Sequence, residues 1–215
     1  MPNRRLLLAA VGLSLAVVVG CASEEEQVAR HIADAERYQE EGDLRSALVE
    51  LQSALNVQPK NADLNEKLAY VLGAMNRPAR AAFYFGEAYR LDPTKTDAAL
   101  AQVPAFYSTD PAAARALIDE VLERDPQKAL AHVRLAELLL IQSQTDEALA
   151  AALTATELEP ENVMARRMVG AVHRSRIRET TLTGGTTDPK VYEAALATYR
   201  TSAKLSADLE RQGPW

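Results

Sequence analysis

Few side chains in this chain could carry out chemistry: it has one cysteine, Cys21, and three histidines, His31, His132 and His173. A single thiol cannot form a disulfide within the chain or complete a zinc site built on cysteines. The sequence has no H-E-x-x-H or C-x-x-C pattern and no G-x-S-x-G, and the Gly-Gly pair in residues 183–186 lacks the G-K-[ST] of a phosphate-binding loop. We therefore predict that the protein is not an enzyme and holds no metal or cofactor.

The charge and composition exclude a further class of function. Asp and Glu outnumber Lys and Arg by 30 to 24, so the net charge is −6. Binding to nucleic acid phosphates needs clustered basic side chains, and we expect no such partner. Hydrophobic residues make up 47% of the chain while aromatic residues make up only 5%. This balance favours a folded, helical protein over a disordered or all-β one.

The N-terminus has the features of an export signal. Arg4 and Arg5 precede an apolar stretch, Leu6–Val19. This stretch is short for a membrane span, which needs roughly 20 residues, but suits a signal peptide. The sequence Val18-Val19-Gly20-Cys21 that ends it resembles the lipobox of bacterial lipoproteins.

The lipobox resemblance implies that residues 1–20 are removed and that Cys21 carries a covalent lipid, with palmitate among its acyl chains. Several acyl chains on one residue would hold the protein stably on a membrane. Ala22 stands where enteric inner-membrane lipoproteins have aspartate, so the resemblance favours the outer membrane, facing the periplasm. Residues 21–27 are expected to be the lipidated cysteine and a short acidic tether. The alternative is an uncleaved signal anchor with an incidental cysteine.

Four prolines mark an internal repeat. Pro59, Pro93, Pro126 and Pro160 are 34, 33 and 34 residues apart, and an alanine stands twelve residues before each: Ala47, Ala81, Ala114 and Ala148. Small or β-branched residues recur five positions before the prolines. A period of this length with these positions, together with Gly42-Asp43-Leu44 in the first repeat, resembles the tetratricopeptide repeat (TPR).

The resemblance implies an all-α TPR superhelix of about four clear helix-turn-helix repeats and a divergent fifth with a capping helix. The expected repeats are residues 28–61, 62–94, 95–128 (degenerate), 129–162 and 163–215. Each proline cannot continue the helix before it, because proline lacks an N–H group. By the same argument, Pro104 should kink or end a helix of the third repeat near Val103. His31 and His132 occupy the same repeat position, and we expect them to be buried or half-buried.

The fifth repeat departs from the pattern. Its first helix is predicted over Val163–Ile177, with Val169, Gly170 and His173 on the packing side. A loop insert centred on residues 180–187 should follow, since threonine and glycine favour loops. Asp188 and Pro189 have the features of a helix N-cap and first helical position, and the last helix, to about Arg211, should bury Tyr192, Ala195, Leu196, Tyr199 and Leu205.

In the TPR family the first helix of each repeat lines a groove that binds partners. Applied to this sequence, the family positions select six candidate groove residues: Glu36, Tyr70, Val133, Glu137, Arg167 and Arg174. The groove would change from acidic through apolar to basic, with Arg166, Arg176 and Arg178 adding to the basic end. The Lys and Asn set that grips chaperone tails in related co-chaperones is missing.

These features predict a membrane-anchored protein–protein interaction scaffold of the bacterial cell envelope. Its partner would be an envelope protein that it holds during assembly or export, of pili and secretins or of polysaccharide. One alternative is a periplasmic carrier that binds a glycan or lipid, with Leu130, Val133, Leu140 and Ile141 around an apolar pocket. Another is a structural helper whose groove is closed by residues 180–188 or by a second copy.

Overall fold

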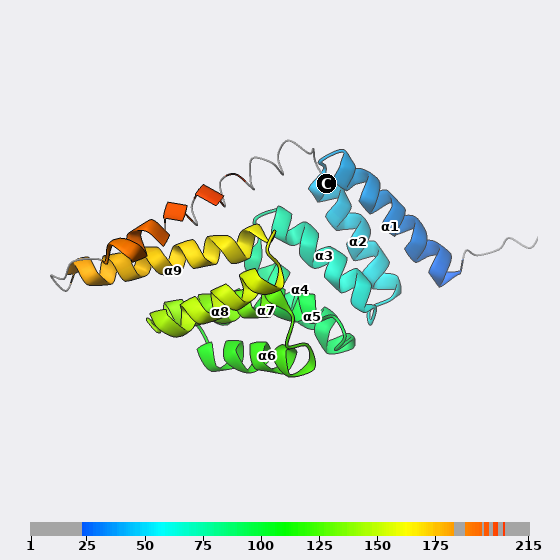
Figure 1. The fold of residues 1–215 in the computed structure, drawn as a ribbon. Coiled ribbons are helices and arrows are strands. Elements are labelled where there is room, and N and C mark those ends of the chain that lie inside the picture. Colours follow the sequence, from blue (N-terminus) through cyan, green and yellow to red (C-terminus); the bar gives the residue numbers. More distant parts are fainter. Residues whose placement is uncertain (1–22, 183–187, 195, 198–199, 202–203, 205–215) are drawn as a thin grey trace, which may run out of the picture.

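The structure, a computed structural model, describes residues 23–182, 188–194, 196–197, 200–201 and 204. The regular elements that it describes in full are all helices: α1 (Glu24–Glu40), α2 (Leu44–Val57), α3 (Ala62–Ala74), α4 (Pro78–Leu91), α5 (Thr96–Gln102), the 3-10 helix η1 (Val103–Phe106), α6 (Pro111–Arg124), α7 (Ala129–Ile141), α8 (Thr145–Leu158) and α9 (Val163–Leu182). Each helix packs against the next along the chain (Figure 1). We call α1, α3, α5, α7 and α9 the first helices and α2, α4, α6 and α8 the second helices of the pairs.

Three first helices end in the same left-handed turn. The residue that follows the cap has a positive φ of 78° at Gly42, 57° at Asn76 and 61° at Ser143. In each turn the residue after the positive-φ residue donates its N–H group to the third carbonyl from the helix end. Asp43, for example, donates to the Tyr38 carbonyl at 2.8 Å. This Schellman arrangement satisfies carbonyls that the helix end leaves open. The second helix therefore starts at once and runs back along the first.

The second helices all end just before a proline. Their C-caps are Gln58, Asp92, Asp125 and Glu159, whose backbone N–H groups still donate to the helix at Ala54, Ala88, Val121 and Ala155. The proline that follows each cap has no N–H group to extend the ladder. The repeat period read from the prolines is thus the period of the helix pairs.

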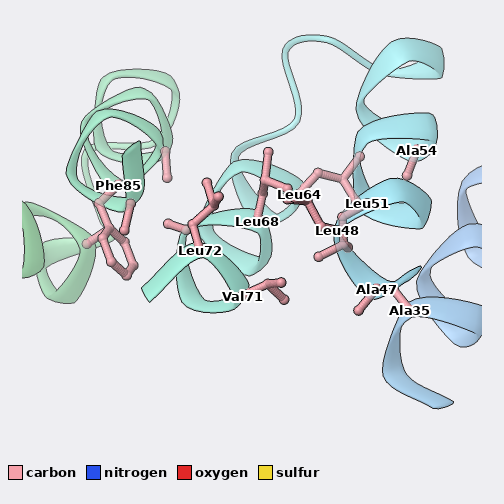
Figure 2. Packing of buried hydrophobic residues seen from close by; sticks show 14 of the residues in the cluster. Ala35, Ala47, Leu48, Leu51, Ala54, Leu64, Leu68, Val71, Leu72 and Phe85 are labelled. Atoms are coloured by element: carbon pink, nitrogen blue, oxygen red, sulfur yellow. The ribbon is translucent and has the colours of Figure 1, made fainter. Parts of the chain in front are cut away.

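Small residues let the first pair pack closely. Ala35 of α1 and both Ala47 and Ala54 of α2 are fully buried. Figure 2 shows Leu48 and Leu51 of α2 on one side of α3 and Phe85 of α4 on the other. Leu68 of α3, between them, is fully buried. One apolar cluster therefore joins the first two pairs and reaches Ala98 of α5.

The third pair is irregular, as Pro104 predicts. α5 ends at Gln102, and Val103 to Phe106 form the 3-10 helix η1. A second apolar cluster, centred on Leu100, Ile118 and Leu138, connects this pair to α7. The stack is therefore continuous through the break.

The tether prediction was wrong for residues 24–27. They form the first turn of α1, with Ser23 as N-cap. The Ser23 hydroxyl accepts from the Glu26 N–H at 3.1 Å, and the Glu26 carboxylate accepts from the Ser23 N–H at 3.2 Å. This reciprocal capping box satisfies two N–H groups that would otherwise be open, and acidic side chains suit the positive end of the helix dipole.

The fifth repeat needs two corrections. Its first helix, α9, continues to Leu182 rather than Ile177, so residues 180–182, assigned to the loop, are helical. The hydroxyls of Thr180 and Thr181 donate to carbonyls four residues earlier, so both polar groups are satisfied within the helix. Helix does begin again at Pro189, and Asp188 accepts from the Lys190 N–H at 2.9 Å. Tyr192, expected to be buried, is 52% exposed.

Several expected positions of that last helix lie outside the described residues, among them Ala195, Tyr199 and Leu205. Cys21 and residues 1–20 lie outside them as well. Leu196 is half-buried.

Candidate binding face

Salt bridges connect successive first helices along one side of the stack. The Lys67 ammonium lies 2.8 Å from Glu36, one helix pair earlier. Lys95, at the start of α5, lies 2.6 Å from both Asp63 and Glu66 of α3, and these carboxylates raise its pKa. Lys128, at the start of α7, lies 2.8 Å from Asp97 of α5. We call the exposed side of α1, α3, α5, α7 and α9 the first-helix face.

These salt bridges reduce the negative charge that the sequence suggests for the acidic end of the groove. Glu36 lies on the first-helix face, as expected, but Lys67 partly neutralises it. Tyr70 also lies on this face and is 55% exposed. Its ring and that of Phe85 form a T-shaped pair, with ring centroids 5.0 Å apart and an interplanar angle of 85°. Tyr70 therefore presents one side of its ring to solvent from a fixed position.

The middle of the face differs most from the expectation. Val133 is fully buried against Ala155 and Ala165, so it belongs to the core and cannot touch a partner. Glu137 is half-buried and accepts a hydrogen bond from the Tyr107 hydroxyl at 2.6 Å and one from Arg134 at 2.9 Å. Burial and the neighbouring Glu137 carboxylate raise the pKa of Tyr107. This cluster holds α7 to η1.

The basic end carries several exposed side chains on one helix face. Met164, Arg167, Ala171, Arg174 and Arg178 follow one another at helical spacing and share one face of α9. Arg167, Arg174 and Arg178 are exposed. Ala171, Arg174, Ser175 and Arg178 line an open hollow of about 400 Å³, together with Leu140 of α7. The structure thus brings Arg174 together with an apolar residue of the preceding pair.

Not every basic residue of α9 belongs to this surface. Arg166 donates to the carbonyl of Pro160 at 2.6 Å, and Arg176 lies 3.0 Å from Asp146 of α8. The Thr145 hydroxyl donates to Glu179 at 2.9 Å. The contacts of Arg176 and Thr145 attach α9 to the preceding pair. Arg166 and Arg176, expected at the basic end of the groove, instead bind groups of their own chain: Arg166 the turn before α9, and Arg176 helix α8.

The histidines hold structural positions. His31 is half-buried, with Nδ1 2.7 Å from Glu50 of α2. The half-buried His132 has Nε2 2.9 Å from the carbonyl of Pro126. His173 is only 8% exposed, and Val169 and Gly170 are also buried, which confirms the packing side expected for α9.

Sequence reasoning missed the lysines that cross between first helices. Lys67 and Glu36 are 31 residues apart, and Lys95 and Glu66 are 29 apart. These separations are slightly shorter than one repeat, so a search for opposite charges at that offset could have found them.

Among the residues described, no group of three or more His, Cys, Asp or Glu side chains could hold a metal ion. Within the same residues, no helix is both long and apolar enough to span a membrane.

Comparisons with known proteins identify the architecture. The chain matches no known protein-family model, and no curated protein matches it. Among solved structures, a MamA protein superposes with a TM-score of 0.64 at 19% identity, over 84% of this chain and 96% of that one. Residues 41 to the end of MamA from Desulfovibrio magneticus RS-1 give 0.65 at 14% identity, over 86% and 98%. YrrB, described as a TPR protein with an unusual peptide-binding site, gives 0.54 at 18% identity, over 83% and 86%.

The helix pairs, their proline-limited period and these neighbours together define the fold. The protein is an all-α TPR superhelix, which confirms the fold class expected from the sequence. At these identities the likeness shows the fold alone.

Proposed function

We propose that this protein is a non-catalytic, membrane-anchored scaffold of the bacterial cell envelope. A lipid on Cys21 anchors it, with the outer membrane favoured and the protein facing the periplasm. The first-helix face holds a partner protein during assembly or export. The lipobox pattern supports the anchor, and the similarity to YrrB, a TPR protein with a peptide-binding site, supports a role in protein binding.

The observation that carries the proposal is the basic end of the first-helix face. Elsewhere on the face, Glu36, Glu66 and Asp97 are paired with lysines of the next helix. On α9, the exposed Arg167 and Arg178 lie on the same side as the hollow beside Leu140. Guanidinium groups beside apolar surface suit an acidic segment that carries an apolar side chain.

The alternative of a glycan or lipid carrier has less support. Of the four residues expected around its pocket, Val133 is fully buried and Leu130 is half-buried. Only Leu140 lines the hollow, and Ile141, although 57% exposed, stands at the end of α7. A ligand pocket ordinarily buries most of its ligand's surface, which an open hollow cannot do.

The test is a crosslinked affinity capture of the full-length protein from detergent-solubilised envelopes, read by mass spectrometry. The variant is Arg167→Ala with Arg178→Ala. Arg174 is kept because it also interacts within the chain. We expect wild type to capture a specific envelope protein and the variant to lose at least about tenfold of it, since removing a desolvated charged contact costs over 1.4 kcal/mol.

The matched control is Arg77→Ala with Arg80→Ala at the start of α4. Both arginines are exposed, and the control removes the same charge far from α9 along the chain. It should capture the partner as wild type does. Equal loss in both variants would point to nonspecific charge attraction, and retention in both would remove the basic end from the proposal.

A further inference from the structure

Helix α1 begins three residues after the proposed lipid site. The capping box makes Ser23 the N-cap of α1, and the Gln27 N–H donates to the Ser23 carbonyl at 2.9 Å. Only Ala22 separates Ser23 from Cys21. Glu24, Glu25 and Glu26, expected to form an acidic tether, are part of the helix.

This spacing limits the distance between the lipid and the stack. An extended chain covers at most about 3.6 Å per residue, so the Cα atom of Cys21 lies within about 7 Å of that of Ser23. α1 has 17 residues and is about 25 Å long. A lipid on Cys21 would therefore bring the beginning of α1 to the bilayer, and the far end of α1 would lie at most about 25 Å further away.

A second segment lies beside the beginning of α1, at the same end of the helices. α2 runs back along α1, and the turn that joins α2 to α3 lies beside Glu24 in the first turn of α1. Glu24 and the turn residues Val57, Gln58, Pro59, Lys60 and Asn61 together line an open hollow of about 490 Å³. The turns at Gly42 and Asn76 lie at the other end of the same helices. We call the edge made of residues 23–26 and 57–61 the anchor edge.

We propose that the anchor edge is a membrane-contact surface that rests on the lipid headgroups. The inference depends on the proposed lipidation of Cys21. Pro59 and Lys60 are exposed at the tip of the turn, where the ammonium group can reach a headgroup phosphate. Glu24, Glu25 and Glu26 outnumber this lysine, so the edge is not attracted to anionic lipid by net charge. The surface therefore fits zwitterionic headgroups and is held there by the covalent lipid.

This contact would orient the first repeats. With the anchor edge on the bilayer, α1 and α2 stand away from the membrane, and the turns at Gly42 and Asn76 point into the periplasm. The first-helix face is made of the sides of helices, so it would stand across the membrane plane rather than parallel to it. A partner would then approach along the membrane surface.

The test uses full-length lipidated protein in phosphatidylcholine vesicles that carry a nitroxide on some headgroups. Lipidation consumes the only native thiol, so an introduced cysteine can be labelled selectively with a fluorophore. Lys60→Cys places the label on the anchor edge, and Arg77→Cys places it at the opposite end. We expect the nitroxide lipid to quench the label at position 60 several-fold more than the label at position 77.

A linker variant supplies the control. Inserting a long Gly-Ser segment between Ala22 and Ser23 keeps the lipid but releases the stack, so quenching at position 60 should fall to that at position 77. The mass of the N-terminal peptide shows whether Cys21 carries lipid. Lipid present with equal quenching at both positions would overturn the membrane contact alone, while an unmodified Cys21 would overturn the anchor and the contact together.

Discussion

His173 shows how burial changes the chemistry of a single residue. Its side chain is nearly enclosed, and within the part of the chain that the structure describes its Nδ1 atom has no hydrogen-bond partner. Burial lowers its pKa, and the nearby Arg176 guanidinium lowers it further. The positive form is therefore disfavoured in the folded protein, and His173 is a neutral packing residue rather than a groove residue.

The lowered pKa of His173 makes part of the free energy of unfolding depend on pH. Below about pH 6.5 the imidazole of an unfolded chain takes up a proton, while the folded His173 resists it. The unfolded state then binds more protons, so stability falls as pH falls through this window. As the pH is lowered from 7.5 to 5.5, we expect the melting temperature of wild type to fall more than that of His173→Leu. An equal fall in the melting temperatures of the two proteins across this range would contradict the effect.

At the scale of the element, α5 shows how the fold accommodates a broken helix. Pro104 has no N–H to donate to the Leu100 carbonyl, four residues earlier. Arg134 of α7 takes that place, because its Nε donates to this carbonyl at 3.1 Å. The Glu137 carboxylate accepts from the guanidinium group at 2.9 Å and from the Tyr107 hydroxyl at 2.6 Å. The irregular third repeat is thus stabilised by side chains of the fourth.

A double-mutant cycle tests whether the Arg134 side chain replaces the N–H group that Pro104 lacks as donor to the Leu100 carbonyl. Arg134→Met removes the side-chain donor from the Leu100 carbonyl, at a cost of about 1–3 kcal/mol in the free energy of unfolding measured with urea. Pro104→Ala supplies a backbone N–H, so Arg134→Met should cost at least about 0.5 kcal/mol less in that background. Equal costs in the two backgrounds would show that Arg134 acts only through Glu137.

At the scale of the whole molecule, stability comes from apolar clusters shared between neighbouring pairs. One cluster extends from Val28 to Ala98, a second from Ala99 to Leu138, and a third from Ala136 to Val172. A single helix pair cannot bury its own apolar side, so each pair depends on the next.

Leu68→Ala should therefore weaken more than its own helix. It removes a fully buried side chain from the first cluster, and we expect a loss of about 2–5 kcal/mol in the free energy of unfolding. Hydrogen exchange should rise in α2 and α4 as well as in α3. Val49→Ala, at a site that is 56% exposed, is the control and should change stability by less than about 0.5 kcal/mol. Faster exchange confined to α3 would argue against shared clusters.

The sequence by itself determined where the second helices end and where α5 breaks. Pro59, Pro93, Pro126 and Pro160 end the second helices because each lacks a backbone N–H, and Pro104 ends α5 for the same local reason. The first turn of α1 was also encoded locally, as Ser23 followed three residues later by Glu26, although the acidic run was interpreted as a tether. Such features depend on residues a few positions apart, which a sequence displays directly.

Only the tertiary structure decided which side chains remain available on the first-helix face. Val133 is core because α8 and α9 close over it. Arg166 and Arg176 satisfy a backbone carbonyl and a carboxylate, whereas Arg167 and Arg178 on the same helix stay exposed. Burial and pairing arise when stacking brings together residues about thirty positions apart. Helical spacing along one segment cannot show which neighbour will meet a given side chain.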